Sequence, residues 1–110
     1  MIILYYIKFD GQYLNGERNG KGKEFYKYRL IFEGEYLNGK RQGLGKGYDY
    51  EEKYIIFEGE YLNDKRHGKG KEYDMNKNIV FEGEYLNGNR FNGKIKEYDS
   101  FNCKILKFEG

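Results

Sequence analysis

The sequence predicts an all-β protein, an elongated, single-layer, twisted antiparallel sheet of tandem β-hairpins. The pattern Phe-(Asp/Glu)-Gly-(Gln/Glu)-Tyr-Leu-Asn occurs four times and starts again at Phe108, at steps of 23, 25, 24 and 27 residues. The 13 Tyr, 8 Phe and 16 Gly recur at fixed places in these repeats, and the chain has no proline, which could not donate to a strand ladder. The four complete copies are residues 9–15, 32–38, 57–63 and 81–87.

Length and composition limit the function classes. The 110 residues predict one repeat domain over residues 1–110. The formal net charge is +2, with acidic and basic residues interleaved, so we expect no nucleic-acid partner. Cys103 is the only cysteine, which excludes an intrachain disulfide and favours a cytoplasmic location, with membrane or cytoskeletal association as an extension. The run 1–7 is too short to span a membrane and is expected to be a strand.

Each unit is expected to form one hairpin. In the third unit, residues 54–62 alternate so that Phe57, Gly59 and Tyr61 share one face, a strand pattern. An Asn-Gly or Asn-Asp step follows, which is typical of a tight turn, and a second polar strand completes the hairpin. The expected hairpins are residues 7–26, 30–49, 55–74 and 79–99, with a partial fifth strand at 105–110.

The charges predict the strand register. A four-residue loop that sets Leu62 opposite His67 also sets Gly59 opposite Gly70 and Glu58 opposite Lys71. The same rule sets Glu33 opposite Lys46 and Asp10 opposite Lys23. In the fourth unit the rule gives a loop one residue longer, with Ile95 in place of a glycine opposite Gly83.

Glycines in mid-strand leave bare backbone on which aromatic rings can lie. We therefore expect rings and glycines to interlock along the array. The predicted structural glycines are Gly11, Gly22, Gly34, Gly45, Gly59, Gly70 and Gly83.

The unit from Phe57 to Gly70 resembles the MORN repeat (membrane occupation and recognition nexus), and the resemblance extends over nearly the whole chain from Phe9. The family pattern is aromatic-x-Gly-x-aromatic, a turn, and Gly-x-Gly. This chain has Phe then Tyr where the family usually has Tyr then Trp, and Ile95 replaces a glycine in the fourth copy. The resemblance implies a curved hairpin sheet that acts as a non-catalytic scaffold, binds partner proteins in an aromatic groove, sometimes dimerises, and is also credited with phospholipid binding.

Two binding surfaces follow as hypotheses. The first is a groove in which the outer faces of the ring rows stay exposed and receive a protein or peptide segment. Its residues are Phe9, Tyr13, Phe32, Tyr36, Phe57, Tyr61, Phe81 and Tyr85. The alternative is weak affinity for anionic phospholipid along basic hairpin tips, which carry a net charge of +4 after Glu17 and Asp64 are counted. The basic residues are Arg18, Lys40, Arg41, Lys65, Arg66 and Arg90. Unpaired terminal strands also favour a homodimer through the repeat ends.

Catalytic chemistry is not expected. His67 is the only histidine and has no second metal ligand nearby in sequence, so we expect no metal and no cofactor. Residues 88–95 match seven positions of a phosphate-binding P-loop, but Ile95 stands where Ser or Thr is required. The glutamate pairs have lysines opposite them, which favours surface charge pairs over acid–base catalysis, and we predict that the chain is not an enzyme.

Overall fold

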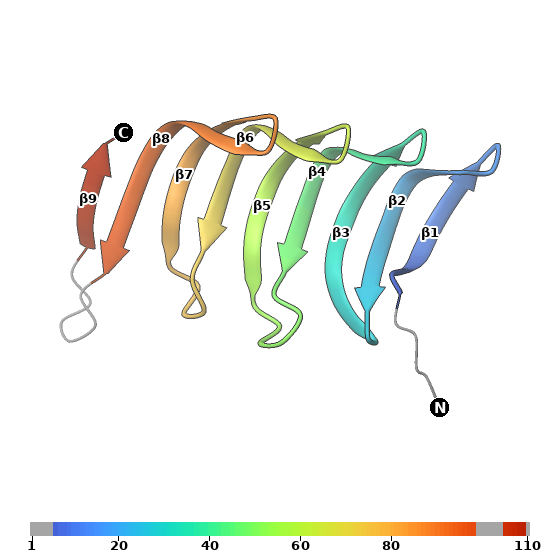
Figure 1. Cartoon of the computed structure of the whole chain (residues 1–110), viewed down its shortest axis with the longest axis horizontal. Helices are drawn as coiled ribbons and strands as arrows, with labels where there is room; N and C mark the ends of the chain where they lie inside the picture. The colour runs from blue at the N-terminus through green and yellow to red at the C-terminus, as the bar shows by residue number, and fades with distance from the viewer. Residues whose placement is uncertain (1–5, 99–104, 110) are drawn as a thin grey trace.

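The computed structural model describes residues 6–98 and 105–109, and these residues form one open antiparallel sheet without helices. Its strands lie side by side in sequence order, as a meander of hairpins (Figure 1). They are β1 (Lys8–Leu14), β2 (Glu17–Tyr26), β3 (Arg29–Leu37), β4 (Lys40–Tyr48), β5 (Ile55–Leu62), β6 (Lys65–Tyr73), β7 (Ile79–Leu86), β8 (Asn89–Tyr98) and β9 (Ile105–Glu109). The predicted all-β hairpin array is confirmed. The expectations for residues 1–5, Cys103 and Gly110 lie outside the described residues.

One row of glycines crosses the sheet, with a single glycine from each strand β1–β8. Each glycine pairs in register with the next. The row is Gly11, Gly22, Gly34, Gly45, Gly59, Gly70, Gly83 and Gly93. The predicted pairing of Gly59 with Gly70 and of Glu58 with Lys71 is confirmed. The two pairs predicted for the other hairpins, Glu33 with Lys46 and Asp10 with Lys23, are also present.

The predicted four-residue loop at the hairpin ends is wrong. Leu62 pairs with Lys65 and Tyr61 with Arg66, so the turn contains only Asn63 and Asp64. These two residues have φ of 49° and 71°, the double positive φ that matches a tight turn to the twist of the strands. Two extra residues then form a bulge in β6 before Gly70. The two extra residues make up for the two residues by which the turn is shorter, so the register beyond the bulge is the one that the four-residue loop predicted.

The expectation for the fourth hairpin is also wrong. Its turn has the same two-residue length, because Leu86 pairs with Asn89. Gly93 stands opposite Gly83, and Ile95 instead pairs with Phe81. The difference from the other hairpins lies in the bulge, which holds one extra residue rather than two. No glycine of the row is therefore missing in this repeat.

The core is a single file of rings on one face of the sheet. Phe32, Phe57 and Phe81 are at most 3% exposed, and Tyr36, Tyr61 and Tyr85 are at most 7% exposed. Phe57 meets Tyr85 edge to face, with ring centroids 5.2 Å apart, and these two rings lie over Gly70 between them. The same contact joins the earlier hairpins at 5.0 and 5.1 Å. Each repeat thus buries its rings against the next one, as expected for a linear array.

Replacement of Gly70 by Ala should destabilise the array. The added Cβ would lie 2.6 Å from Cε1 and 2.7 Å from Cζ of the Phe57 ring, which is fixed between neighbouring strands. We expect a loss of about 1–3 kcal/mol, the usual range for overpacking, measured by urea unfolding followed by circular dichroism.

Gly47→Ala is the matched control. A Cβ at Gly47 would meet no atom closer than 3.9 Å, so we expect a change below about 0.5 kcal/mol. Equal losses for the two variants would show that ring contact does not explain the glycine row.

Candidate functional site

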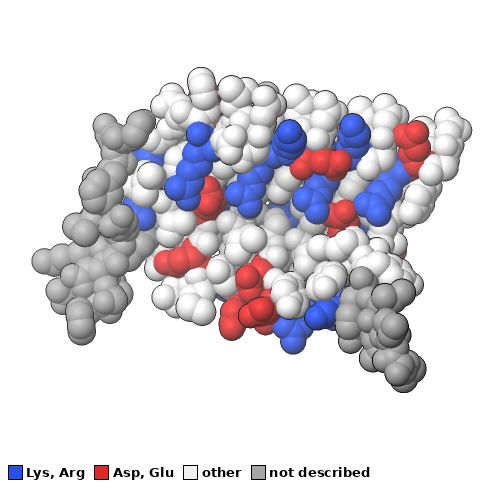
Figure 2. Space-filling model, in the orientation of Figure 1, with Lys and Arg blue, Asp and Glu red and all other residues white. Residues whose placement is uncertain are grey.

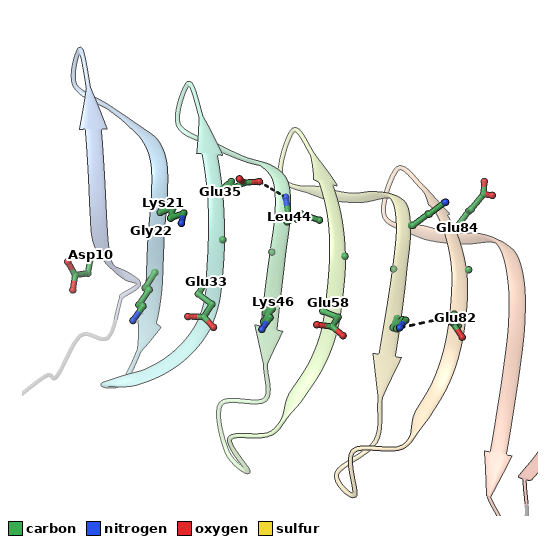
Figure 3. A pocket seen from close by; sticks show the side chains of 18 residues that line it. Asp10, Lys21, Gly22, Glu33, Glu35, Leu44, Lys46, Glu58, Glu82 and Glu84 are labelled. Atoms are coloured by element: carbon green, nitrogen blue, oxygen red, sulfur yellow. Dashed lines mark hydrogen bonds and ion pairs between the residues drawn. The ribbon is translucent and has the colours of Figure 1, made fainter.

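A groove of about 1120 Å³ crosses the sheet on the face opposite the rings. A Cβ on a row glycine would point into the rings, whereas the residues before and after it point to the other face. The groove therefore has bare backbone as its floor and charged side chains as its walls (Figure 3). β1 lies on the right in Figure 1 and on the left in Figure 3, while the hairpin turns point upward in both. Figure 3 therefore shows the sheet from the opposite side, and the groove faces away from the viewer in Figures 1 and 2.

One wall is a ladder of alternating acid and base, here called the charge ladder. Each member pairs in register with the next across the sheet. Its residues are Asp10, Lys23, Glu33, Lys46, Glu58, Lys71 and Glu82. Lys71 Nζ lies 3.7 Å from Glu82 Oε2. The alternation places opposite charges on neighbouring strands along the whole wall, which supports the register and leaves the wall close to neutral.

Tyrosines support the charge ladder on the side away from the groove floor. Tyr48 donates its hydroxyl proton to Glu33 Oε1 at 2.6 Å, and Tyr73 donates to Glu58. Burial and these hydrogen bonds to carboxylates raise the pKa of Tyr48 and the pKa of Tyr73 to about 12. Both hydroxyls therefore remain protonated donors at physiological pH and hold the carboxylates in place.

The other wall lies nearer the turns and is here called the turn-side wall. It contains Lys21, Glu35, Leu44, Lys69 and Glu84. Glu35 Oε2 accepts a hydrogen bond from the backbone N–H of Leu44 at 2.8 Å, which satisfies a donor at the bulge. Glu60 Oε2 accepts a hydrogen bond from the backbone N–H of Lys69 at 2.6 Å, and Gln12 Oε1 accepts one from the backbone N–H of Lys21 at 3.0 Å. These carboxylates, predicted as surface charge pairs, thus also cap backbone groups.

The predicted partner residues do not form this groove. Six of the eight rings are buried: Phe32, Tyr36, Phe57, Tyr61, Phe81 and Tyr85. The expectation that their outer faces stay exposed is wrong, because arginines cover them. The guanidinium carbon of Arg41 lies 4.0 Å from the ring centroid of Phe32, and that of Arg66 lies 4.1 Å from that of Phe57. Of the remaining two, Phe9 is partly buried and Tyr13 is 60% exposed.

The basic tips are also arranged differently from the expectation. The four arginines pair in register with tyrosines instead of standing in loops, and each covers a ring of its own hairpin. They are Arg18, Arg41, Arg66 and Arg90. Lys40 and Lys65 remain exposed beside the turns. The free edge with net charge +4 is therefore absent from the described residues, because the short turns draw the arginines into the strands.

Two glutamates hold three of the four arginines over the rings, and the sequence reasoning missed both. Glu24 is 7% exposed and accepts hydrogen bonds from Arg18 Nη1 and Arg41 Nε, each at 2.9 Å. Glu72 accepts from Arg90 Nε at 2.7 Å and Nη2 at 2.9 Å. Figure 2 shows the resulting row of basic side chains across this face, with acidic side chains between them. A sequence pattern could have indicated these two residues. Glutamate stands opposite the repeat phenylalanine in the first and third hairpins, whereas Gly47 and Ile95 stand there in the second and fourth.

Metal or nucleotide chemistry finds no support in the described part of the chain. No group of three or more His, Cys, Asp or Glu side chains there could hold a metal ion. His67 Nδ1 accepts a long hydrogen bond of 3.5 Å from the backbone N–H of Asn87. The P-loop-like residues form a turn and part of β8 rather than a loop before a helix.

Glu72 should make stability depend on acid pH. Burial tends to raise its pKa, but hydrogen bonds from Arg90 and Tyr85 outweigh burial and lower the pKa below the ordinary glutamate value. A carboxyl with a lowered native pKa stabilises fully above its unfolded pKa, and this stabilisation is lost as pH falls through the native pKa. Glu72→Gln should therefore be less stable than the parent at neutral pH and lose less stability on acidification.

Urea unfolding midpoints measured from neutral to acid pH test this expectation. Glu52→Gln is the control, since that side chain is exposed in the β4–β5 loop and should leave the pH profile unchanged. Parallel pH profiles for Glu72→Gln and the parent would contradict the assignment.

Comparison with known proteins now identifies the family. The family model described as MORN repeat matches residues 9–27, 32–46 and 57–78, which together make up half of the chain. No curated protein matches the sequence. Within the described residues, no helix is long and apolar enough to cross a membrane. The matched segments start at the phenylalanines of the first three hairpins, and this chain belongs to the MORN repeat family.

Proposed function

We propose that this chain is a non-catalytic scaffold or adaptor module that binds a segment of a partner protein along the glycine-floored groove. MORN repeats are generally modules for protein or membrane interaction. The observation that supports the proposal is the groove itself, which is built by every strand from β1 to β7 and is lined only by glycine, charged residues and one leucine. A surface repeated along an array in this way is typical of extended binding sites in repeat proteins.

The dimensions fit a polypeptide. The two walls are set by residues two apart on each strand, about 7 Å between their Cα atoms. Seven strands at about 4.8 Å spacing give a length of about 29 Å. Both signs of charge alternate along the charge ladder, which suits a segment with mixed charges better than a polyanion such as a nucleic acid.

The lipid alternative has less structural support. Four of its six basic residues lie against rings on the opposite face, and Glu24 and Glu72 neutralise three of them through hydrogen bonds. A basic surface attracts anionic lipid in proportion to its uncompensated charge. We therefore favour binding of a protein segment in the groove over lipid binding at the hairpin tips.

A peptide-display selection tests the proposed function. A library of linear peptides long enough to span the groove is selected for binding to the intact chain, and the selected peptides are titrated against two variants. Lys46→Gln/Lys71→Gln changes the charge ladder, and we expect at least about tenfold weaker binding, or about 1.4 kcal/mol.

Lys53→Gln/Lys77→Gln is the matched control, because both lysines are exposed in loops at the other ends of the strands. This control should bind as the parent does. Failure to select any peptide, or equal binding to both double variants, would refute the proposed site.

A further inference from the structure

We propose that the groove takes an amphipathic α-helix, anchored on an apolar patch around Leu44 and carrying acidic residues one heptad to each side that meet Lys21 and Lys69. This inference rests on the proposed function and specifies the class of partner. It depends on three properties of the groove: its saturated floor, the leucine at its centre and the two basic residues beside it.

The floor favours a helix over an extended chain. From β2 to β7, each strand of the floor is paired on both sides, so the glycine backbone of the floor is already committed to the sheet ladders. An extended segment lying across these strands would find no backbone partners in the floor for its own N–H and C=O groups. A helix satisfies those groups internally and presents only side chains, which is the usual mode of helix-in-groove recognition.

Leu44 provides an apolar anchor particular to the second repeat. It is 65% exposed and occupies the place in β4 that lysine occupies in β2 and β6. Two further exposed leucines lie on the same face beside it. Leu62 is two residues beyond Glu60, which pairs with Leu44, and Leu37 is two residues beyond Glu35, which caps the Leu44 amide. Their exposed fractions are 38% and 48%, so three exposed leucines from β3, β4 and β5 share this face around the Leu44 position.

The flanking charges specify the ligand. Lys21 in β2 and Lys69 in β6 each lie two strands from Leu44, or about 9.6 Å at ordinary strand spacing. One heptad of an α-helix spans about 10.5 Å, so side chains at i, i+7 and i+14 match Lys21, Leu44 and Lys69. Neither ammonium group forms an ion pair among the described residues.

The neighbouring acids reinforce this preference. Glu35, beside Lys21, and Glu60, beside Leu44, direct a carboxylate oxygen to a backbone N–H of the bulges. Glu84 pairs in register with Lys69 but forms no ion pair with it. An acidic side chain of the helix must therefore be directed at Lys69 and away from Glu84. Acidic side chains on the helix at the two heptad positions therefore complement the groove, and basic ones there oppose its unpaired charges.

Three synthetic peptides test the inference on the full chain. The first is an alanine-rich helix of about 21 residues, with leucines at its centre and glutamate one heptad to each side. The second has lysine in place of the two glutamates. The third keeps the composition of the first but contains prolines that prevent helix formation. Binding is measured by isothermal titration calorimetry at low salt.

The glutamate peptide should bind at least about tenfold more tightly than either of the others. Leu44→Lys should weaken its binding by about tenfold, and this variant should fold because lysine already occupies the equivalent place in β2 and β6. Met75→Lys, an exposed apolar residue in the β6–β7 loop, is the control and should bind as the parent does.

Absence of binding by the glutamate peptide, equal affinity for the glutamate and lysine peptides, or insensitivity to Leu44→Lys would overturn the inference. If display-selected peptides bind the charge ladder while all three synthetic helices fail, the proposed function stands and the helical, acidic partner is excluded. If neither set binds the groove, both proposals fall.

Discussion

Close packing of aromatic rings on backbone that lacks Cβ atoms is the constraint on which this structure depends. Each phenylalanine of the file lies over a glycine of the next strand. For Phe9, Phe32 and Phe57, the next hairpin contributes a tyrosine whose ring meets the phenylalanine edge to face. A hairpin alone could not bury its phenylalanine, so each repeat is stable only beside its neighbours. The strand order and the hairpin register bring each of these three phenylalanines to the tyrosine of the next hairpin within a single layer.

The same glycines shape both faces of the sheet. On the ring face, the absence of a Cβ makes room for the core, and arginines held by Glu24 and Glu72 cover it. On the opposite face, where the flanking residues point, the glycine row leaves a floor without side chains between two charged walls. A single residue type therefore creates both the packed side and the open side of the array. The open side is where a partner has room.

The bulges connect local chemistry to the groove. Short turns at the Asn-Gly and Asn-Asp steps leave extra residues in the even-numbered strands, and these residues bulge just before the glycine row. The bulge presents a backbone N–H to the groove face, and Glu35 and Glu60 cap it. In the first hairpin Gln12 serves the same purpose without a charge. The turn-side wall thus contains Glu35, whose carboxylate caps a backbone N–H, and Lys21 and Lys69, whose ammonium groups form no ion pair among the described residues.

The sequence by itself determined the repeats, the all-β class, the pairing of Gly59 with Gly70 and the alternation of Glu58 with Lys71, because strand alternation and charge pairing are local and have a period of two. It could not decide between a four-residue loop and a two-residue turn with a bulge, since both keep each side chain on the same face. Only the tertiary structure decided this, and with it the place of Arg41 over Phe32, the burial of the rings and the identity of the exposed face. The rings are buried by contacts between neighbouring hairpins, such as that of Phe57 with Tyr85, and Arg41 is held over Phe32 by Glu24 of the preceding hairpin, so neither follows from the pattern of a single repeat.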